Sequence, residues 1–198
     1  MKTNYVLIDF ENVQPKNMSL LKDGPFQIKV FLGSNQSKIP LEMARALQAF
    51  GPNAEYIQIE GNGNNALDFH IAFYIGELSN ADSNCFFHII SKDSGFDPLI
   101  KHLKIKKILC QRSTSISDIP LIKISNSTST PEKVAAIIDN LIKRGTSRPR
   151  SINTLKSSIK SLFINKIDDQ EVEELFDLLV KNETIQFTKE KINYNFHY

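Results

Sequence analysis

Acidic residues stand at three separated places where the sequence predicts the end of a buried strand or the start of a helix. Asp9 ends an apolar run and is followed closely by Asn12, while Asp68 falls in the first turn of a predicted helix. Asp93 comes just after another apolar run. Because the carboxyl ends of parallel strands share one edge of a sheet, we expect these acids to lie together.

Carboxylates drawn from three elements repel one another and take up protons unless a cation lies between them. The chain has only two cysteines, without metal-type spacing, and no suitably spaced histidines. Oxygen donors without soft ligands favour Mg²⁺ or Mn²⁺ over Zn²⁺. Such a site can activate a water molecule and stabilise charge during phosphodiester hydrolysis. Each acid alone is equally compatible with ordinary turn or cap chemistry, so the prediction rests on the set.

The elements that must position these acids alternate between strands and helices. Three apolar runs predict strands buried on both faces of a sheet: Tyr5–Asp9, Gln27–Leu32 and Phe86–Ser91. Weaker strand candidates are Glu55–Ile59, Lys107–Cys110 and, as an edge strand, Leu121–Ile124. Helical spacing of apolar residues occurs at Met43, Leu47 and Phe50 and across Asn65–Ser79. Alternating strands and helices predict βαβ crossovers, and therefore an open, three-layer, parallel α/β domain over residues 1–125.

Beyond a polar linker at residues 126–130 the pattern changes to a smaller α+β domain at residues 131–198. Thr130 is expected to cap a first helix that Pro131 begins. A second helix spans Ile152–Leu162, and Asp168 with Glu171 resembles a capping box before a third. Alternating strands follow on both sides of a turn at residues 189–191. Three helices followed by a hairpin predict a winged-helix-like outline.

Three segments resemble the motifs of the NYN and PIN-like ribonucleases. They are Ile8–Val13, Asn65–His70 and Ile90–Leu99, and their order on strand, helix and strand is similar to that family over residues 4–110. The resemblance implies a metal-dependent endoribonuclease. It also implies that Asp9, Asp68 and Asp93 bind Mg²⁺ or Mn²⁺ and that Asn12 assists beside Asp9. Many relatives carry a further Asp where Gly95 stands, so the number of metal ions is left open.

Two further residues are candidates for the same site. Asp97 precedes Pro98, and the residue before a proline favours the extended conformation that a helix N-cap needs. We therefore expect Asp97 to cap a helix running from Pro98 towards Leu103; the alternative is that it replaces the acid absent at Gly95. Asn65 ends a glycine-rich loop, Gly61–Asn65, which either contacts substrate phosphates at the helix start or is a flexible turn.

The net charge of +2 conceals an uneven distribution. Residues 140–167 carry basic side chains and no acid. In residues 168–183 the charged side chains are all Asp or Glu except Lys181. The candidates for binding RNA phosphates are Lys92, Lys101, Lys104, Arg144, Arg148 and Arg150. A winged helix usually presents its third helix to DNA, but here that helix holds the acidic block, which argues against major-groove reading. We expect this module to bind RNA, preferably single-stranded, or to pair with another protein or a second copy of the chain.

Composition narrows the class of protein. A hydrophobic fraction of 41% excludes a wholly disordered chain. No apolar run approaches the ~20 residues that span a bilayer, and no signal-peptide pattern begins the chain, so no membrane partner is expected. Two cysteines without a disulfide framework fit a reducing, cytoplasmic location.

Two other α/β classes fit less well. A haloacid-dehalogenase-type phosphatase needs an Asp where Glu11 stands, and a phospho-receiver needs an acceptor Asp where Glu60 follows the third strand. The sequence therefore leaves two hypotheses from different classes. The first is a divalent-metal-dependent endoribonuclease, and the alternative is a catalytically weak RNA-binding or regulatory protein on the same fold.

Overall fold

The computed structural model describes residues 2–22, 24–188 and 191–196. The chain forms two compact units, Met1–Ile119 and Pro120–Tyr198. The division falls before the expected linker, and the expected edge strand at residues 121–124 is instead part of helix α4 (Pro120–Ser125) in the second unit. Proline fits the first turn of a helix, where its missing N–H needs no partner, and this explains why a helix begins there.

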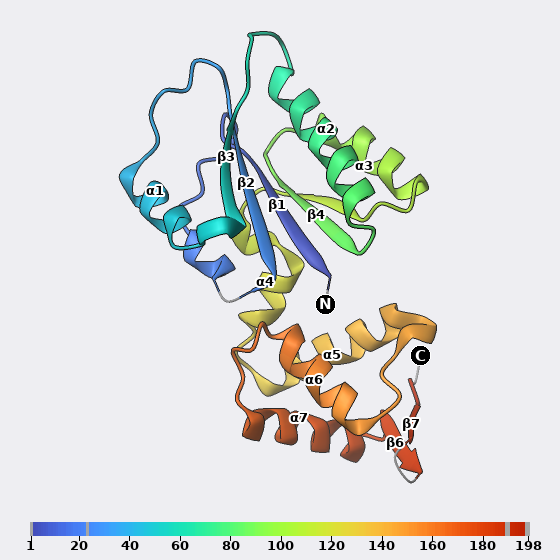
Figure 1. Cartoon of the computed structure of the whole chain (residues 1–198). Coiled ribbons are helices and arrows are strands. Elements are labelled where there is room, and N and C mark those ends of the chain that lie inside the picture. Colours follow the sequence, from blue (N-terminus) through green and yellow to red (C-terminus); the bar gives the residue numbers. More distant parts are fainter. Residues whose placement is uncertain (1, 23, 189–190, 197–198) are drawn as a thin grey trace. The chain divides into compact units, whose positions relative to one another are not determined.

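The first unit is built on a five-stranded sheet, β3-β2-β1-β4-β5, in which every pair of neighbours is parallel (Figure 1). The strands are β1 (Thr3–Asp9), β2 (Phe26–Leu32), β3 (Ala54–Gln58), β4 (Cys85–Ile90) and β5 (Cys110–Ser113). From β1 the chain extends the sheet on one side through β2 and β3, and then on the other through β4 and β5. The strand order therefore reverses between β1 and β4. The open parallel sheet expected from the sequence is confirmed, and β5 begins where its weak candidate was expected to end.

Helices cover both faces of this sheet. The helices are α1 (Leu41–Gln48), α2 (Ala66–Ala81) and α3 (Phe96–Ile105), with short 3-10 turns η1 (Met18–Leu21), η2 (Gly51–Asn53) and η3 (Ile116–Asp118). Leu7 of β1 and Phe87 of β4 belong to one buried cluster with Ile71 of α2 and Phe96 of α3. Figure 1 shows α1 on the opposite side of the sheet from α2 and α3. The three-layer α/β architecture is therefore as predicted.

The second unit contains three longer helices and a hairpin. They are α5 (Thr130–Arg144), α6 (Ile152–Leu162), α7 (Asp169–Lys181) and the antiparallel strands β6 (Ile185–Thr188) and β7 (Lys191–Tyr194), with a 3-10 turn η4 (Gly145–Ser147) after α5. Lys189 and Glu190 of the expected hairpin turn lie outside the described residues. A core that includes Leu141, Leu155 and Leu175 joins the helices. This arrangement is compatible with the expected small α+β domain.

Local capping decides where these helices begin. The Asp168 carboxylate accepts a hydrogen bond from the Glu171 backbone N–H at 2.8 Å, which confirms the expected cap of α7. The cap of α5 is Ser129, whose hydroxyl accepts from the Glu132 backbone N–H at 3.4 Å, and the prediction of Thr130 was wrong by one residue. Ser129 has the extended backbone that a cap requires, whereas Thr130 is already helical. Across the described residues, no helix is long and apolar enough to cross a membrane.

Candidate active site

Asp9 is the last residue of β1, and its carboxylate is only 1% exposed. One oxygen, Oδ2, accepts hydrogen bonds of 2.7 Å from the Ser91 hydroxyl and of 2.7 Å from the Asn12 side-chain amide. The other, Oδ1, accepts from the Asn12 backbone N–H at 3.2 Å. Burial of a charged group is costly without such partners. Asn12 therefore lies beside Asp9, as expected, and together with Ser91 it fixes the orientation of the carboxylate.

Ser91 follows β4 and connects Asp9 to the third acidic segment. Its buried hydroxyl also accepts a hydrogen bond of 3.0 Å from the Asp93 backbone N–H. The Asp93 carboxylate in turn accepts from the Gly95 N–H at 2.7 Å. A Cβ at Gly95 would lie 3.1 Å from Asp93 Oδ1, so glycine allows this close approach of backbone to carboxylate. Ser91 was not among the predicted site residues; its only signal in the sequence was a small polar residue directly after a buried strand.

Asp68, in the first turn of α2, is partly buried near several other acids. Burial raises the pKa of Asp68 to about 6, and the negative charges of Asp9, Asp93 and Glu11 contribute to the rise. Glu11 was not among the predicted site residues. Its carboxylate lies over Gly33, where an added Cβ would come within 1.8 Å of Glu11 Oε1. In the sequence, the only sign of this close contact was Gly33, a glycine placed directly after a buried strand.

Asp9 and the segment that carries Asp93 lie at the point where the strand order reverses. Asp9 ends β1 and Ser91 follows β4, its neighbour in the sheet, and open α/β sheets commonly bind ligands in the crevice at such a point. Within the part of the chain that the structure describes, no three His, Cys, Asp or Glu side chains are arranged closely enough to hold a metal ion. The oxygen-only donors fit a hard divalent cation, and the repulsion felt by Asp68 is what a cation would relieve.

Asp97 has a different structural role from the one predicted. Helix α3 begins at Phe96 with Gly95 in the N-cap position, so Asp97 is already helical and the prediction that it caps the helix was wrong. Its carboxylate accepts hydrogen bonds from Arg112 Nε at 2.9 Å and Nη2 at 3.1 Å. These bonds lower the pKa of Asp97. The guanidinium on β5 offers two charge-assisted bonds, which are stronger than a single bond to a backbone N–H.

The glycine-rich loop before α2 is anchored by one side chain. Asn62 accepts hydrogen bonds from the hydroxyl of Ser34 and, at 3.2 Å, from the side-chain amide of Asn35, both in the segment after β2. Asn65 occupies the N-cap position with a left-handed φ of 62° and makes no side-chain cap bond. Asparagine tolerates this conformation better than most residues. Asn65 is therefore an exposed residue at the start of α2 without a side-chain capping role.

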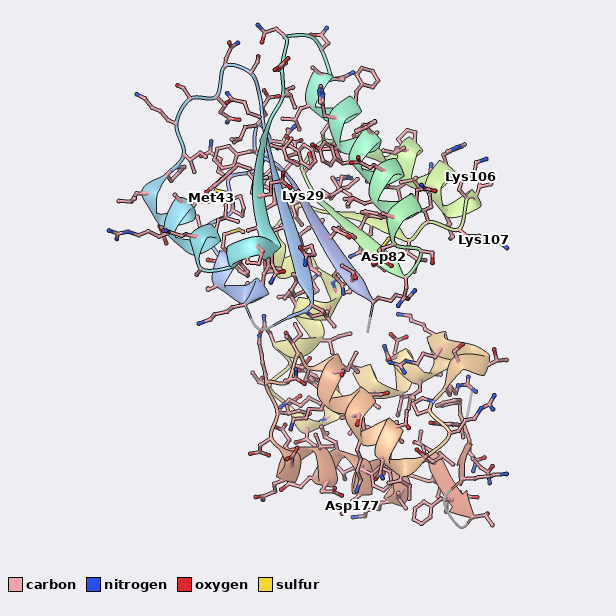
Figure 2. All side chains as sticks on the ribbon, in the orientation of Figure 1. Lys29, Met43, Asp82, Lys106, Lys107 and Asp177 are labelled. Atoms are coloured by element: carbon pink, nitrogen blue, oxygen red, sulfur yellow. The ribbon has the colours of Figure 1, made fainter. Side chains whose placement is uncertain are left out.

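Five lysines lie before, along and after α3. Lys92 is exposed between Ser91 and Asp93, and Lys101 is close enough to Asp97 to lower its pKa further. Lys104 lies one turn beyond Lys101. Lys106 and Lys107 follow the end of α3, away from the strand ends (Figure 2). A ten-residue helix is about 15 Å long, so these last two lysines are far from the acids.

The basic and acidic blocks of the second unit are partly paired with each other. Lys156 and Lys160 of α6 form salt bridges with Glu173 and Asp169 of α7. Lys133 of α5 pairs with a third acid of α7. The predicted RNA-binding arginines lie elsewhere: Arg144, Arg148 and Arg150 line a groove beside the hairpin.

Comparison with known proteins agrees with the fold of the first unit. The family model of the PIN domain matches residues 3–113, which include the whole five-stranded sheet and Asp9, Asp68 and Asp93. The chain therefore belongs to the PIN domain family. PIN domains are usually nucleases, typically use divalent metal ions and generally bind RNA. Comparison with curated proteins and with solved structures gives no match.

Proposed function

We propose that this protein is a divalent-metal-dependent endoribonuclease of the NYN type that hydrolyses phosphodiester bonds in single-stranded RNA. The observation that carries the proposal is that Ser91 joins the Asp9 carboxylate to the Asp93 segment at the carboxyl end of a PIN domain sheet. Asp68 is near enough for both charges to add to the effect of burial on its pKa. The three carboxylates come from the end of β1, the first turn of α2 and the loop after β4, at the end of the sheet where open α/β folds commonly bind ligands. A structural role for these acids does not require them to approach one another.

Each residue of the proposed site has a role that its contacts support. Asp9, Asp68 and Asp93 would hold Mg²⁺ or Mn²⁺, and the ion when bound supplies an activated water and stabilises charge on the phosphate. Asn12 and Ser91 hold the Asp9 carboxylate in place. The exposed cations Lys92, Lys101 and Lys104 would contact the RNA backbone, and Asn65 the substrate beside Asp68. Asp97 acts through Arg112 and not as a ligand.

The alternative is a catalytically weak RNA-binding or regulatory protein on the same fold. The observation in its favour is Gly95, whose backbone N–H binds Asp93 at the position where the NYN and PIN-like motif that the sequence resembles implies a second acid. Fewer acids weaken the hold on a cation. One measurement distinguishes the two functions. Only the endoribonuclease should cleave RNA in a reaction that depends on both Mn²⁺ and Asp93.

The second unit is proposed as a winged-helix-like accessory domain that assists RNA binding in the cytoplasm. Its three helices and hairpin support this assignment. Pairing with another protein or a second copy is the alternative role for this domain.

The test uses the full chain and a labelled single-stranded RNA. Cleavage is expected in Mn²⁺ or Mg²⁺ and should stop on addition of EDTA. Asp93→Asn should lower the rate by roughly 10²-fold or more, because a metal-held nucleophile contributes several kcal/mol. Glu77→Gln removes an exposed acid from α2 and serves as the matched control, which should cleave like the wild type. Cleavage by a folded Asp93→Asn variant at the wild-type rate would exclude the proposed site.

A further inference from the structure

The second unit contains a groove of about 1370 Å³ bordered by η4, the start of α6 and the hairpin. Four cationic residues line it: Arg144, Arg148, Arg150 and Lys191. Serine and threonine hydroxyls make up much of the remaining lining, and no described lining residue is acidic. A concave surface with several positive charges and hydroxyl donors fits a chain of phosphates.

Within the described residues of the second unit, no salt bridge neutralises the cations of this groove. The lysines of α6 that lie farther along the sequence, Lys156 and Lys160, are paired with acids of α7. Arg144 donates only a long bond of 3.4 Å to the Ser158 hydroxyl. Among the described residues, no carboxylate pairs with Arg150 or Lys191, and both are exposed. Of the basic residues at 140–167, Lys156 and Lys160 therefore pair with α7, whereas the three arginines line the groove.

Arg148 differs from the other three cations because it is held in place. Its Nε donates to the Leu141 carbonyl at 2.8 Å. Its guanidinium lies over the ring of Phe196, 4.6 Å from the centroid, and 5.7 Å from that of Tyr194. The Tyr194 hydroxyl donates to the Pro149 carbonyl at 2.7 Å, which ties the hairpin to the segment that carries Arg148. The guanidinium is therefore preorganised by a backbone carbonyl and two aromatic rings, and Arg148 lines the groove.

We propose that this groove binds single-stranded RNA, with Arg144, Arg150 and Lys191 on phosphates and an unpaired base stacked on Arg148. Arginine planes are common stacking surfaces for the splayed bases of single-stranded RNA, and a base-paired strand cannot offer its base in this way. An acidic peptide would use the charges but would leave the stacking surface without a partner. The inference rests on the proposed function only in that the RNA is taken to be the substrate of the first unit.

The charge part of the proposal is tested by fluorescence anisotropy of a labelled oligouridine with the full chain, in EDTA and over a range of salt concentrations. Arg150→Ala and Lys191→Ala should each weaken binding about fivefold and reduce the salt slope by about 0.7, the contribution of one phosphate contact to a single strand. Lys143→Ala is the matched control, because Lys143 is exposed on α5, pairs with Asp139 and does not line the groove. Groove variants that bind like Lys143→Ala overturn the proposal.

The stacking part is tested with substitutions that keep the charge. Arg148→Lys should weaken oligouridine binding several-fold more than Arg150→Lys, since only the first removes a stacked plane; equal effects overturn the role of Arg148. Phe196→Leu, which removes the supporting ring, gives a second test if Arg148→Lys does not fold. A duplex RNA or polyglutamate that competes as well as oligouridine also overturns the proposal. Asp93→Asn should bind normally in EDTA, so loss of cleavage and loss of groove binding are distinguishable results.

Discussion

The hydroxyl of Ser91 joins Asp9 to Asp93, because it donates to the Asp9 carboxylate at 2.7 Å and accepts the Asp93 backbone N–H at 3.0 Å. Asp9 ends β1, and Ser91 and Asp93 follow β4, its parallel neighbour. A single buried side chain therefore ties together the ends of the two strands between which the sheet reverses its order. The separation of the two acids depends on this serine.

Ser91→Ala should destabilise the protein and lower its activity. The substitution removes one donor from the buried Asp9 carboxylate and leaves the Asp93 N–H without an acceptor, and such a loss costs about 1–3 kcal/mol. Urea unfolding measures the change in stability, and Ser94→Ala, on the exposed loop nearby, is the matched control. Equal unfolding midpoints for the two variants would contradict the role assigned to Ser91.

The sequence predicted where Asp9 and Asp93 stand but not what connects them. Uninterrupted apolar runs predict buried parallel strands, and parallel strands end at one edge, so an acid at each strand end has a predictable position. The contact between Asp9 and Ser91 joins residues 82 positions apart. It depends on the strand order and register, which apolar patterns do not specify. Glu11 was missed for the same reason, since its neighbour Gly33 follows another strand, β2.

Asp68→Asn should stabilise the protein at neutral pH while abolishing cleavage. The folded pKa of Asp68, about 6, lies above the usual value of 3.8, so folding disfavours its charged form above pH 6. Since this side chain is only partly buried, screening by solvent reduces the gain from neutralising it to about 1 kcal/mol. Thermal melts from pH 4 to pH 7.5 should show the advantage of the variant growing as the pH rises. Glu77→Gln, on the same helix, should show no such trend.

His88 should make the protein less stable as the pH falls from 6.5 to 4. It is buried on β4, where one ring nitrogen lies 2.9 Å from the Asn4 side-chain oxygen and the other 3.2 Å from the Gln111 side-chain amide. Burial lowers the pKa of His88 to about 4, so the unfolded chain takes up a proton that the folded chain does not. The contribution to the free energy of unfolding is up to about 3 kcal/mol, and it is lost across this range.

His88→Gln keeps hydrogen-bonding groups at this position but does not titrate. Its free energy of unfolding, measured in urea at several pH values, should fall less than that of the wild type between pH 6.5 and 4. His102→Gln removes an exposed histidine from α3 and should behave like the wild type. Parallel curves for the wild type and His88→Gln would show that the buried imidazole is not responsible.

The charged blocks of the second unit could be predicted from the sequence, but their pairing could not. The adjacent basic and acidic blocks are visible in the sequence, and the acids do fall on the predicted third helix. Their pairing depends on how helices pack, because Lys156 and Glu173 meet across two helices. Only the structure separates these paired lysines from Arg148 and Arg150, which line the groove.

The ion pair between Asp97 and Arg112 should position the site rather than take part in the reaction. Arg112 binds both oxygens of Asp97 and also donates to the Ser91 carbonyl at 3.3 Å, so it connects α3 to the segment that holds Asp9. A double-mutant cycle with Asp97→Asn and Arg112→Gln tests this relationship. Each single variant removes the same pair, so the double variant should be hardly less stable or less active than either one.

The kinetic outcome distinguishes positioning from ligation. If Asp97 acts through Arg112, Asp97→Asn and Arg112→Gln should lower kcat by similar, few-fold amounts and leave the Mn²⁺ dependence of cleavage unchanged. A metal ligand would behave differently, because loss of its charge should raise the Mn²⁺ concentration needed for half-maximal activity, and Arg112→Gln would not reproduce that shift. Additive effects in the double variant, together with a Mn²⁺ requirement raised by Asp97→Asn alone, would show instead that Asp97 is a metal ligand.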